Sequence, residues 1–297
     1  MARLTANGIG IEYDIHGPEG GEPIVLVMGL GAQMIRWSMD MVGDLAGRGY
    51  RVVRFDNRDV GLSHRFDDAP PPSIGDVAKA VREGRRPDVP YFLSDMAADA
   101  AGVIEGLGLG SAHVVGASMG GMIVQMLAAE HPHRVRSMTS IMSSTGNPTL
   151  PPAKPEAVAF LVNRGPDPHQ DLDAFLEHGL KSARVMAGPA GLHDEAAERA
   201  GIEASFRRAY YPVGFLRQYA AILGSGDRRE ALRRITAPTV VIHGADDPLV
   251  PVEGGHDTAA CVPGAEMHVL GGMGHNIPAP LVPTVCNLIE RAVRRAA

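Results

Sequence analysis

The chain has 297 residues, of which 45% are hydrophobic, and a formal net charge of −6. This size and composition suit one large folded core, while the negative charge excludes a broad electrostatic attraction to nucleic acid or acidic lipid. The sequence has no apolar run long enough to span a bilayer, no signal-peptide pattern and only two cysteines, so we expect a reducing, cytoplasmic setting without membrane or nucleic-acid partners.

Six short apolar runs predict β-strands, in chain order over residues 24–28, 51–56, 113–117, 138–142, 239–243 and 267–270. Their nearly continuous apolar character is typical of strands covered on both faces, as in a parallel sheet. A helix is predicted from Ser94, as its N-cap, to Gly108, and further helices over 122–131 and 281–293. Strands that alternate with helices predict an α/β fold with a doubly wound, mostly parallel sheet.

One segment interrupts this alternation. Residues 146–226 contain proline clusters and helical stretches, and no run in this segment reads clearly as a strand. We therefore predict that residues 1–145 and 227–297 form the core. Residues 146–226 are predicted to be a mostly helical insertion, because they are few for a separate domain with its own core.

Residues 116–120, with the sequence Gly-Ala-Ser-Met-Gly, follow one predicted strand and open the next predicted helix. A nucleophile at a sharp strand-to-helix turn needs small neighbours, since the backbone there is strained and closely packed. The amino terminus of the helix also favours developing negative charge. Ser118 is therefore the candidate nucleophile, and the alternative is a serine that only caps the helix.

A serine nucleophile needs a base to accept its proton, and the sequence offers twelve histidines. His275 ends the run Gly-Met-Gly-His that follows the predicted strand 267–270. The glycines allow a tight loop that can bring the imidazole back over the end of the sheet. His275 is therefore the candidate base, and His243 and His256 are weaker candidates.

The base in turn needs a carboxylate that holds the imidazole in the working tautomer and stabilises its charged form. Asp246 and Asp247 both follow the predicted strand 239–243. They lie between the candidate nucleophile and the candidate base in the chain, as the acid does in folds of this kind. On these observations, either aspartate is a candidate for the carboxylate partner of the base.

The tetrahedral intermediate of acyl transfer needs backbone N–H donors for its oxyanion. The residue after the nucleophile, Met119, is one candidate, and the second comes from a glycine-rich loop after an early strand. Residues 27–31, Val-Met-Gly-Leu-Gly, form such a loop, and Leu30 is the candidate in it. The polar run 56–63 at another strand end is interpreted as mainly structural, with Arg58 hydrogen-bonded to a carboxylate.

Together these motifs resemble the α/β-hydrolase superfamily over nearly the whole chain. Their order along the chain is more specific than any single motif: oxyanion loop, Asp-x-Arg loop, Gly-x-Ser-x-Gly, helical insertion, Gly-x-x-Asp and Gly-x-Gly-His. The resemblance selects Asp247 over Asp246, because the superfamily's acid falls three residues after a glycine, here Gly244. It also implies that residues 146–226 form a cap over the active site.

Two departures from the superfamily pattern are informative. The oxyanion loop usually reads His-Gly where this chain has Met28-Gly29, and the polar loop usually reads Arg-Gly where it has Arg58-Asp59. Both variants resemble those of aclacinomycin methylesterases and related carboxylesterases. The cap segment shows no clear match. Because the cap shapes the pocket, the substrate does not carry over from this resemblance.

The resemblance implies a serine carboxylesterase that cleaves a small or medium ester, a small-molecule substrate, through an acyl-enzyme and without metal or organic cofactor. A lactonase, a carbon–carbon bond hydrolase or a cofactor-free perhydrolase with the same triad is the alternative. A non-catalytic ligand receptor is disfavoured by the complete triad. The large apolar and aromatic residues of the cap are candidates for an apolar pocket or for the cap's own packing: Phe160, Phe175, Met186, Phe206, Tyr210, Tyr211 and Phe215.

Overall fold

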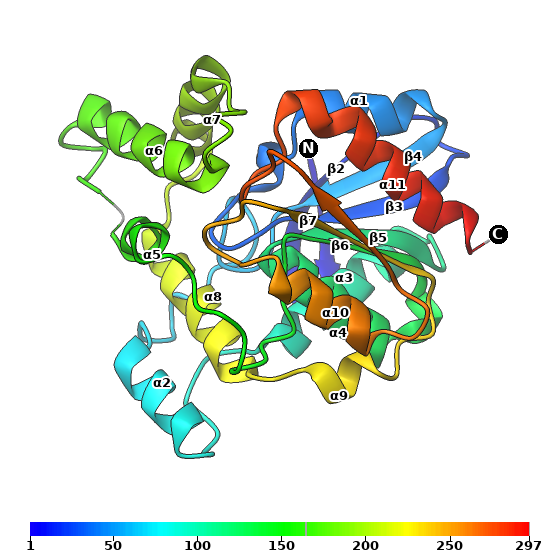
Figure 1. The fold of residues 1–297 in the computed structure, drawn as a ribbon, viewed down its shortest axis with the longest axis horizontal. Coiled ribbons are helices and arrows are strands. Elements are labelled where there is room, and N and C mark those ends of the chain that lie inside the picture. Colours follow the sequence, from blue (N-terminus) through cyan, green and yellow to red (C-terminus); the bar gives the residue numbers. More distant parts are fainter. Residues whose placement is uncertain (164, 297) are drawn as a thin grey trace.

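A computed structural model describes residues 1–163 and 165–296 and contains an eight-stranded sheet with helices on both faces (Figure 1). The strands are β1 (Ala2–Ala6), β2 (Ile9–His16), β3 (Glu22–Val27), β4 (Tyr50–Phe55), β5 (Ala112–Ala117), β6 (Val135–Ile141), β7 (Thr239–Gly244) and β8 (Glu266–Leu270). Their order across the sheet is β1-β2-β4-β3-β5-β6-β7-β8, and from β4 to β8 all neighbours are parallel. The predicted α/β fold with a mostly parallel sheet is confirmed.

Strands β1 and β2 form an antiparallel hairpin that the sequence analysis did not predict. Asn7 and Gly8 connect them, both with positive φ, of 48° and 78°. An Asn-Gly pair is the preferred sequence for such a two-residue turn, because both central residues need a left-handed backbone. The hairpin adds two antiparallel strands at one edge of the sheet, where β2 pairs with β4.

Alternate residues of the central strands pack against different helices. Val25 and Val27 belong to one buried cluster with α3 (Leu93–Gly106) and α4 (Met119–Glu130), whereas Ile24 and Leu26 belong to another with α1 (Met39–Gly47) and α11 (Val282–Arg294). These helix pairs lie on opposite faces of the sheet in Figure 1. This alternation follows from the two-residue period of a strand, and it explains why both faces of the strands are apolar.

The remaining elements of the core are short. They are η1 (Met34–Arg36), α2 (Ile74–Arg82), η2 (Pro132–Arg134), α9 (Arg229–Leu232), α10 (Glu253–Cys261) and η3 (Ala279–Leu281). Helix α3 begins one residue before Ser94, so the predicted N-cap is wrong. The backbone N–H of Phe92 donates instead to the Asp95 carboxylate at 2.8 Å, and this aspartate closes the first turn.

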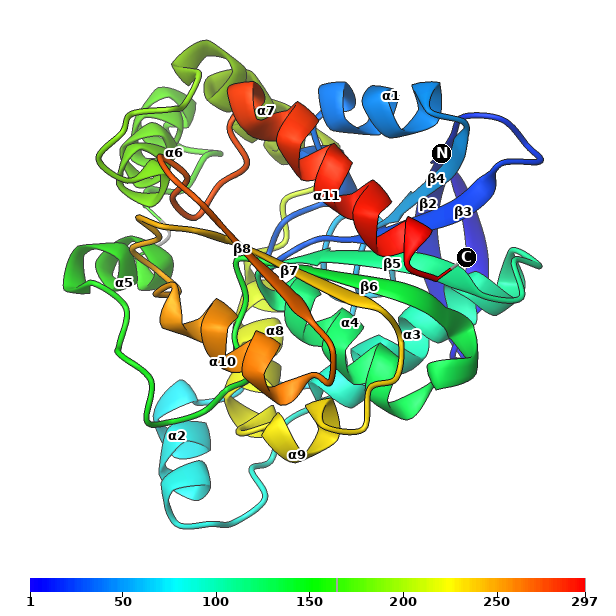
Figure 2. The same ribbon diagram turned by 45° about the vertical axis from the view of Figure 1, so that its right-hand side comes forward.

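Between β6 and β7 the described residues form the helices α5 (Pro155–Val162), α6 (Leu172–Ala187), α7 (Glu195–Arg208) and α8 (Pro212–Ser225). Figures 1 and 2 both place α5 and α6 to the left of the sheet. The two ends of the segment meet, since the N–H of Arg228 donates to the Thr145 carbonyl at 2.9 Å. Among the described residues, no helix has both the length and the apolar character needed to cross a bilayer.

The start of α4 packs very closely on β3, and this contact gives a test of the fold around the candidate nucleophile. A Cβ atom added to Gly120 would lie 2.0 Å from the carbonyl oxygen of Val27. Since a backbone atom cannot move aside as the end of a side chain can, we expect Gly120→Ala to lower the free energy of unfolding by about 3 kcal/mol. Urea denaturation of the purified variant measures this loss.

Gly43 provides the matched control. It is an exposed glycine within α1, and a Cβ there would meet nothing within 4 Å. Alanine has a higher helix propensity than glycine. Gly43→Ala should therefore raise the free energy of unfolding by up to about 1 kcal/mol. Equal denaturation midpoints for the two variants would contradict the close packing of α4 on β3.

Candidate active site

Ser118 lies at the turn between β5 and α4, with backbone angles of φ 56° and ψ −120°. A residue other than glycine is strained in this region and persists only where the surrounding structure holds it. The Ser118 N–H donates to the Ile141 carbonyl at the end of β6, at 2.9 Å. Although Ser118 occupies the N-cap position of α4, its side chain makes no capping hydrogen bond. The geometry therefore gives no support to a serine that only caps the helix.

The structure brings Ser118, His275 and Asp247 together. The Oγ atom of Ser118 lies 3.0 Å from Nε2 of His275, and Nδ1 of His275 lies 2.7 Å from Oδ2 of Asp247. The three residues follow β5, β8 and β7, whose carboxyl ends meet at one edge of the sheet. In this arrangement the imidazole can accept the serine proton while the carboxylate holds the opposite nitrogen.

The loop after β7 distinguishes the two adjacent acids. The Oδ1 atom of Asp247 accepts hydrogen bonds from the N–H groups of Leu249 and Val250, at 2.9 and 2.8 Å, which fix the buried carboxylate. Asp246 is half-exposed, and among the described residues its carboxylate has no hydrogen-bond partner. Of the two aspartates, Asp247 is therefore the one that lies against the imidazole of His275.

The two weaker histidine candidates lie elsewhere. His256 is exposed on α10. His243 is buried, with Nε2 2.8 Å from the carbonyl oxygen of Val250 and 3.6 Å from Oδ2 of Asp247. Burial lowers the pKa of His243 and keeps its imidazole neutral at neutral pH. A neutral ring that donates to Val250 supports the loop of Asp247.

Both candidate oxyanion donors lie in segments that adjoin Ser118. Met119 is the first residue of α4, so its N–H has no acceptor within the helix. A Cβ added to Gly29 would lie 3.2 Å from the Ser118 Cβ and 3.7 Å from its Oγ, which shows how closely this loop approaches the serine. Leu30 follows Gly29 and is half-buried. The backbone is thus placed to offer donors from two sides.

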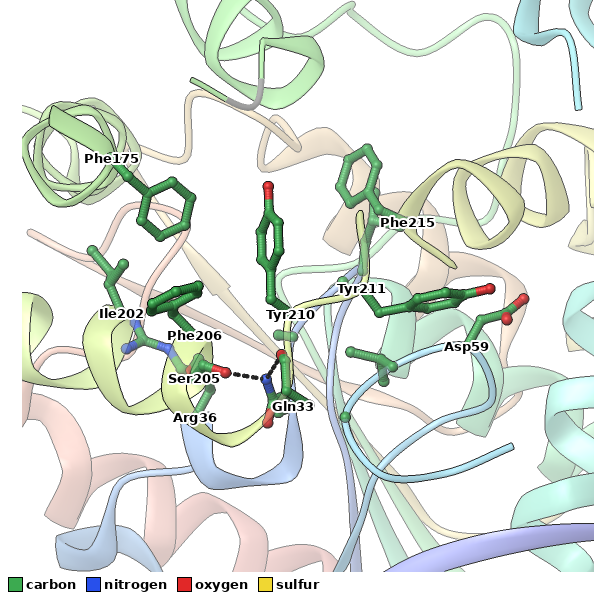
Figure 3. A pocket seen from close by; sticks show the side chains of 16 residues that line it. Gln33, Arg36, Asp59, Phe175, Ile202, Ser205, Phe206, Tyr210, Tyr211 and Phe215 are labelled. Carbon is green, nitrogen blue, oxygen red and sulfur yellow. Dashed lines mark hydrogen bonds between the residues drawn. The ribbon is translucent and has the colours of Figure 1, made fainter. Parts of the chain in front are cut away.

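Two glutamines connect the oxyanion loop to the helices between β6 and β7, and sequence reasoning missed both. The Gly31 N–H donates to Oε1 of Gln218 in α8 at 2.8 Å. The Nε2 group of Gln33 donates to the carbonyls of Ser205 and Ala209, at 2.7 and 2.8 Å, as drawn in Figure 3. The conformation of the oxyanion loop therefore depends on α7 and α8 as well as on the core.

Helix α6 makes a similar contact with the loop of the candidate base. The backbone N–H of His275 donates to the carbonyl oxygen of Met186 at 2.7 Å, near the end of α6. Asn276 donates from its side chain to the Leu192 carbonyl at 3.3 Å. The segment between β6 and β7 therefore helps to hold the His275 loop in place.

The charged side chains of the polar loop after β4 are buried and are paired with residues of other segments. Arg58 donates two hydrogen bonds of 2.6 Å to the carboxylate of Asp99, in agreement with the structural interpretation of this loop. Asp59 accepts from the Tyr91 hydroxyl at 2.7 Å and lies 3.4 Å from the Arg217 guanidinium. Burial raises the pKa of Asp59. The residue that departs from the superfamily pattern is thus the partner of an arginine in α8.

A cavity of about 240 Å³ lies between the oxyanion loop, the polar loop and the helices α6 to α8. Leu30 is part of its wall. Five of the apolar and aromatic residues that the sequence analysis noted also line it, and all are labelled in Figure 3: Phe175, Phe206, Tyr210, Tyr211 and Phe215. Among the described residues, no group of three or more histidine, cysteine, aspartate or glutamate side chains is placed to hold a metal ion.

The sequence pattern of the family described as alpha/beta hydrolase fold matches residues 22–279, so the chain belongs to that family. It is 28% identical to the putative carbamate hydrolase RutD of Variovorax paradoxus, over 90% of each chain. It is 25% identical to rhodomycin D methylesterase DnrP of Streptomyces peucetius, over 91% of each chain. Among solved structures, a meta-cleavage product hydrolase of Pseudomonas fluorescens has a TM-score of 0.77 at 18% identity, with 100% of this chain and 98% of that chain covered.

These relatives are hydrolases, and the chain is accordingly a hydrolase of the α/β-hydrolase superfamily. The methylesterase among them agrees with the resemblance to methylesterases in the oxyanion and polar loops. The likeness to the meta-cleavage product hydrolase supports the fold alone, because the sequence identity is low.

Proposed function

We propose that this hydrolase is a serine carboxylesterase that cleaves a small or medium carboxylic ester through an acyl-enzyme intermediate. The observation that supports it best is the hydrogen-bonded chain from Ser118 Oγ to His275 at 3.0 Å and from His275 to Asp247 at 2.7 Å. An ester is among the substrates that this nucleophile, base and acid attack without activation by a metal ion.

In the proposed reaction, Ser118 Oγ attacks the ester carbonyl carbon while Nε2 of His275 accepts the hydroxyl proton. The N–H groups of Leu30 and Met119 hold the oxyanion of the tetrahedral intermediate. His275 then gives its proton to the leaving alcohol, and the acyl group remains on Ser118. His275 takes a proton from a water molecule as that water attacks the acyl carbon, and it then gives the proton to Ser118 Oγ as the acid leaves. Asp247 stabilises the imidazolium in both steps.

Within this proposal, residues 146–226 act as a cap over the active site, and residues 1–145 and 227–297 form the catalytic core. Three contacts support a cap that also shapes the site. They are the hydrogen bonds of Gln218 to the oxyanion loop, of Gln33 to the end of α7, and of Met186 to the base loop.

A lactonase, a carbon–carbon bond hydrolase and a cofactor-free perhydrolase use the same triad and are the alternatives. These enzymes differ from an esterase in the bond that they cleave, so a comparison of substrates distinguishes them. A ligand receptor without catalysis would not need Ser118 in a strained backbone conformation, with φ 56°. It would also not need the Ser118 Oγ within 3.0 Å of His275 Nε2.

A substrate panel tests the proposal. We expect saturable hydrolysis of esters in which the acyl chain and the alcohol are varied independently, and a higher kcat/KM for the best ester than for a γ-lactone or a vinylogous diketone. The matched Ser118→Ala protein should lack this activity. Cleavage of the diketone without cleavage of any ester would overturn the esterase proposal in favour of a carbon–carbon bond hydrolase.

A further inference from the structure

The charges in the cavity wall are already paired within the protein. Among the described lining residues, Arg36 and Asp59 are those that carry a charge. The Arg36 guanidinium donates to Glu198 of α7 at 2.5 Å. Asp59 lies 3.4 Å from the Arg217 guanidinium and accepts from the Tyr91 hydroxyl. Each charge therefore has a counter-charge, and neither is left over for a charged group of a substrate.

The rest of the wall is largely aromatic. The rings of Phe175, Phe206 and Tyr210 contact one another with centroid distances between 5.8 and 6.1 Å. Figure 3 shows Tyr210 standing between this pair of phenylalanines and Phe215 on the other side. Such walls favour a planar apolar group, which gains both from contact with ring faces and edges and from the removal of its apolar surface from water.

The cavity touches the oxyanion loop, although none of the three triad residues is among its described lining residues. Leu30, a candidate oxyanion donor, lines it. One residue further on, a Cβ added to Gly31 would lie 2.7 Å from the ring of Phe215 in the cavity wall. One residue before, Gly29 approaches Ser118. Residues 29–31 thus connect the surroundings of Ser118 with the cavity wall.

From these observations we propose that the cavity takes an uncharged, apolar or aromatic part of the ester, and that Glu198 is a specificity residue that disfavours esters carrying a second carboxylate. Glu198 does so by occupying Arg36, the cation that would otherwise pair with such a carboxylate. Both side chains are partly exposed, at 29% and 28%, so the pair can rearrange without unfolding the wall. The inference rests on the proposed esterase function and names the substrate class of that site.

The test compares matched neutral and anionic esters. One pair, phenyl acetate and 4-carboxyphenyl acetate, varies the alcohol side. The other, methyl benzoate and monomethyl terephthalate, varies the acyl side. The wild-type protein should prefer the neutral member of at least one pair by about tenfold or more in kcat/KM, because a carboxylate would enter the cavity without a partner.

Glu198→Gln should change this preference. The variant frees Arg36, so kcat/KM for the anionic ester of that pair should rise by about fivefold, while the neutral ester changes by less than about twofold. Adding Arg36→Met should remove the gain, since no cation is left to bind the carboxylate. A thermal unfolding scan of each variant checks that the fold is retained.

Glu203→Gln is the matched control. Glu203 lies on the same helix and pairs with the exposed Arg207 at 2.6 Å, outside the cavity, so its loss changes the net charge equally without freeing Arg36. A gain for Glu198→Gln alone supports the inference. Equal ratios of anionic to neutral ester in the wild type, Glu198→Gln and Glu203→Gln overturn it, as does a wild type that accepts both members of each pair equally. Absence of hydrolysis of every ester would instead refute the esterase proposal on which it rests.

Discussion

Replacing Ser118 with alanine should lower kcat for ester hydrolysis by about 10³- to 10⁶-fold. The substitution removes the atom that attacks the carbonyl, so covalent catalysis is lost together with the proton transfer to His275. The fold should survive, because the Ser118 side chain makes no capping bond and the backbone N–H that bonds Ile141 is unchanged. Steady-state kinetics on the best ester of the panel and a circular dichroism spectrum measure the two outcomes.

Ser143 offers the control for this variant. It is a buried serine near the start of α4, and its hydroxyl has no hydrogen-bond partner among the described residues. Ser143→Ala therefore removes an equally small hydroxyl without touching the triad, and its kcat should stay within about twofold of the wild type. Near-normal turnover by a folded Ser118→Ala protein would show that Ser118 is not the nucleophile.

Asp247→Asn should lower kcat by about 10⁴-fold, the cost of this change in a related triad. The amide keeps the shape of the carboxylate but presents a different hydrogen-bonding pattern to Nδ1 of His275. The imidazole is then held in the wrong tautomer, with its proton on the nitrogen that should accept from Ser118. The hydrogen bonds from Leu249 and Val250 to Oδ1 can still form, so the loop itself is expected to hold.

Asp246→Asn is the matched variant one residue away. Asp246 is half-exposed, and Asp247 is the residue in contact with His275. Screening by solvent should limit its effect on kcat to about threefold or less. If the two losses were measured in the reverse order, the acid would be Asp246, and the register of this loop would be wrong, while Ser118 and His275 would keep their proposed roles.

Most of the fold could be predicted because it depends on local patterns. The six parallel strands appear as apolar runs, and β5 and β7 are predicted to within one residue. The hairpin of β1 and β2 was overlooked although its Asn7-Gly8 turn is a strong signal, because the flanking strands are partly exposed and lack a continuous apolar run. Ser94 was misread because Asp95 caps the turn from inside the helix.

The candidate triad could likewise be proposed from sequence, since each residue follows a strand and the strands of a parallel sheet end at one edge. The contacts that hold the oxyanion loop could not be predicted from the sequence. Gln218 meets Gly31 across 187 residues, and Arg217 meets Asp59 across 158 residues. The sequence around a buried glutamine or arginine in a helix does not predict which distant residue it contacts. Asp59 did give a signal, as a charged residue at a position usually held by glycine, but its partner was visible only in the structure.

The central claim, that Ser118 is the nucleophile of an esterase, is tested most directly with a fluorophosphonate, which forms a stable bond only with an activated serine. After incubation, the intact mass should increase by one phosphonyl group per chain, and peptide mapping should place it on Ser118. Hydrolysis of the best ester should fall in proportion to the labelled fraction, and Ser118→Ala should take up no label. Labelling at another residue, or full ester hydrolysis by the labelled protein, would contradict the account.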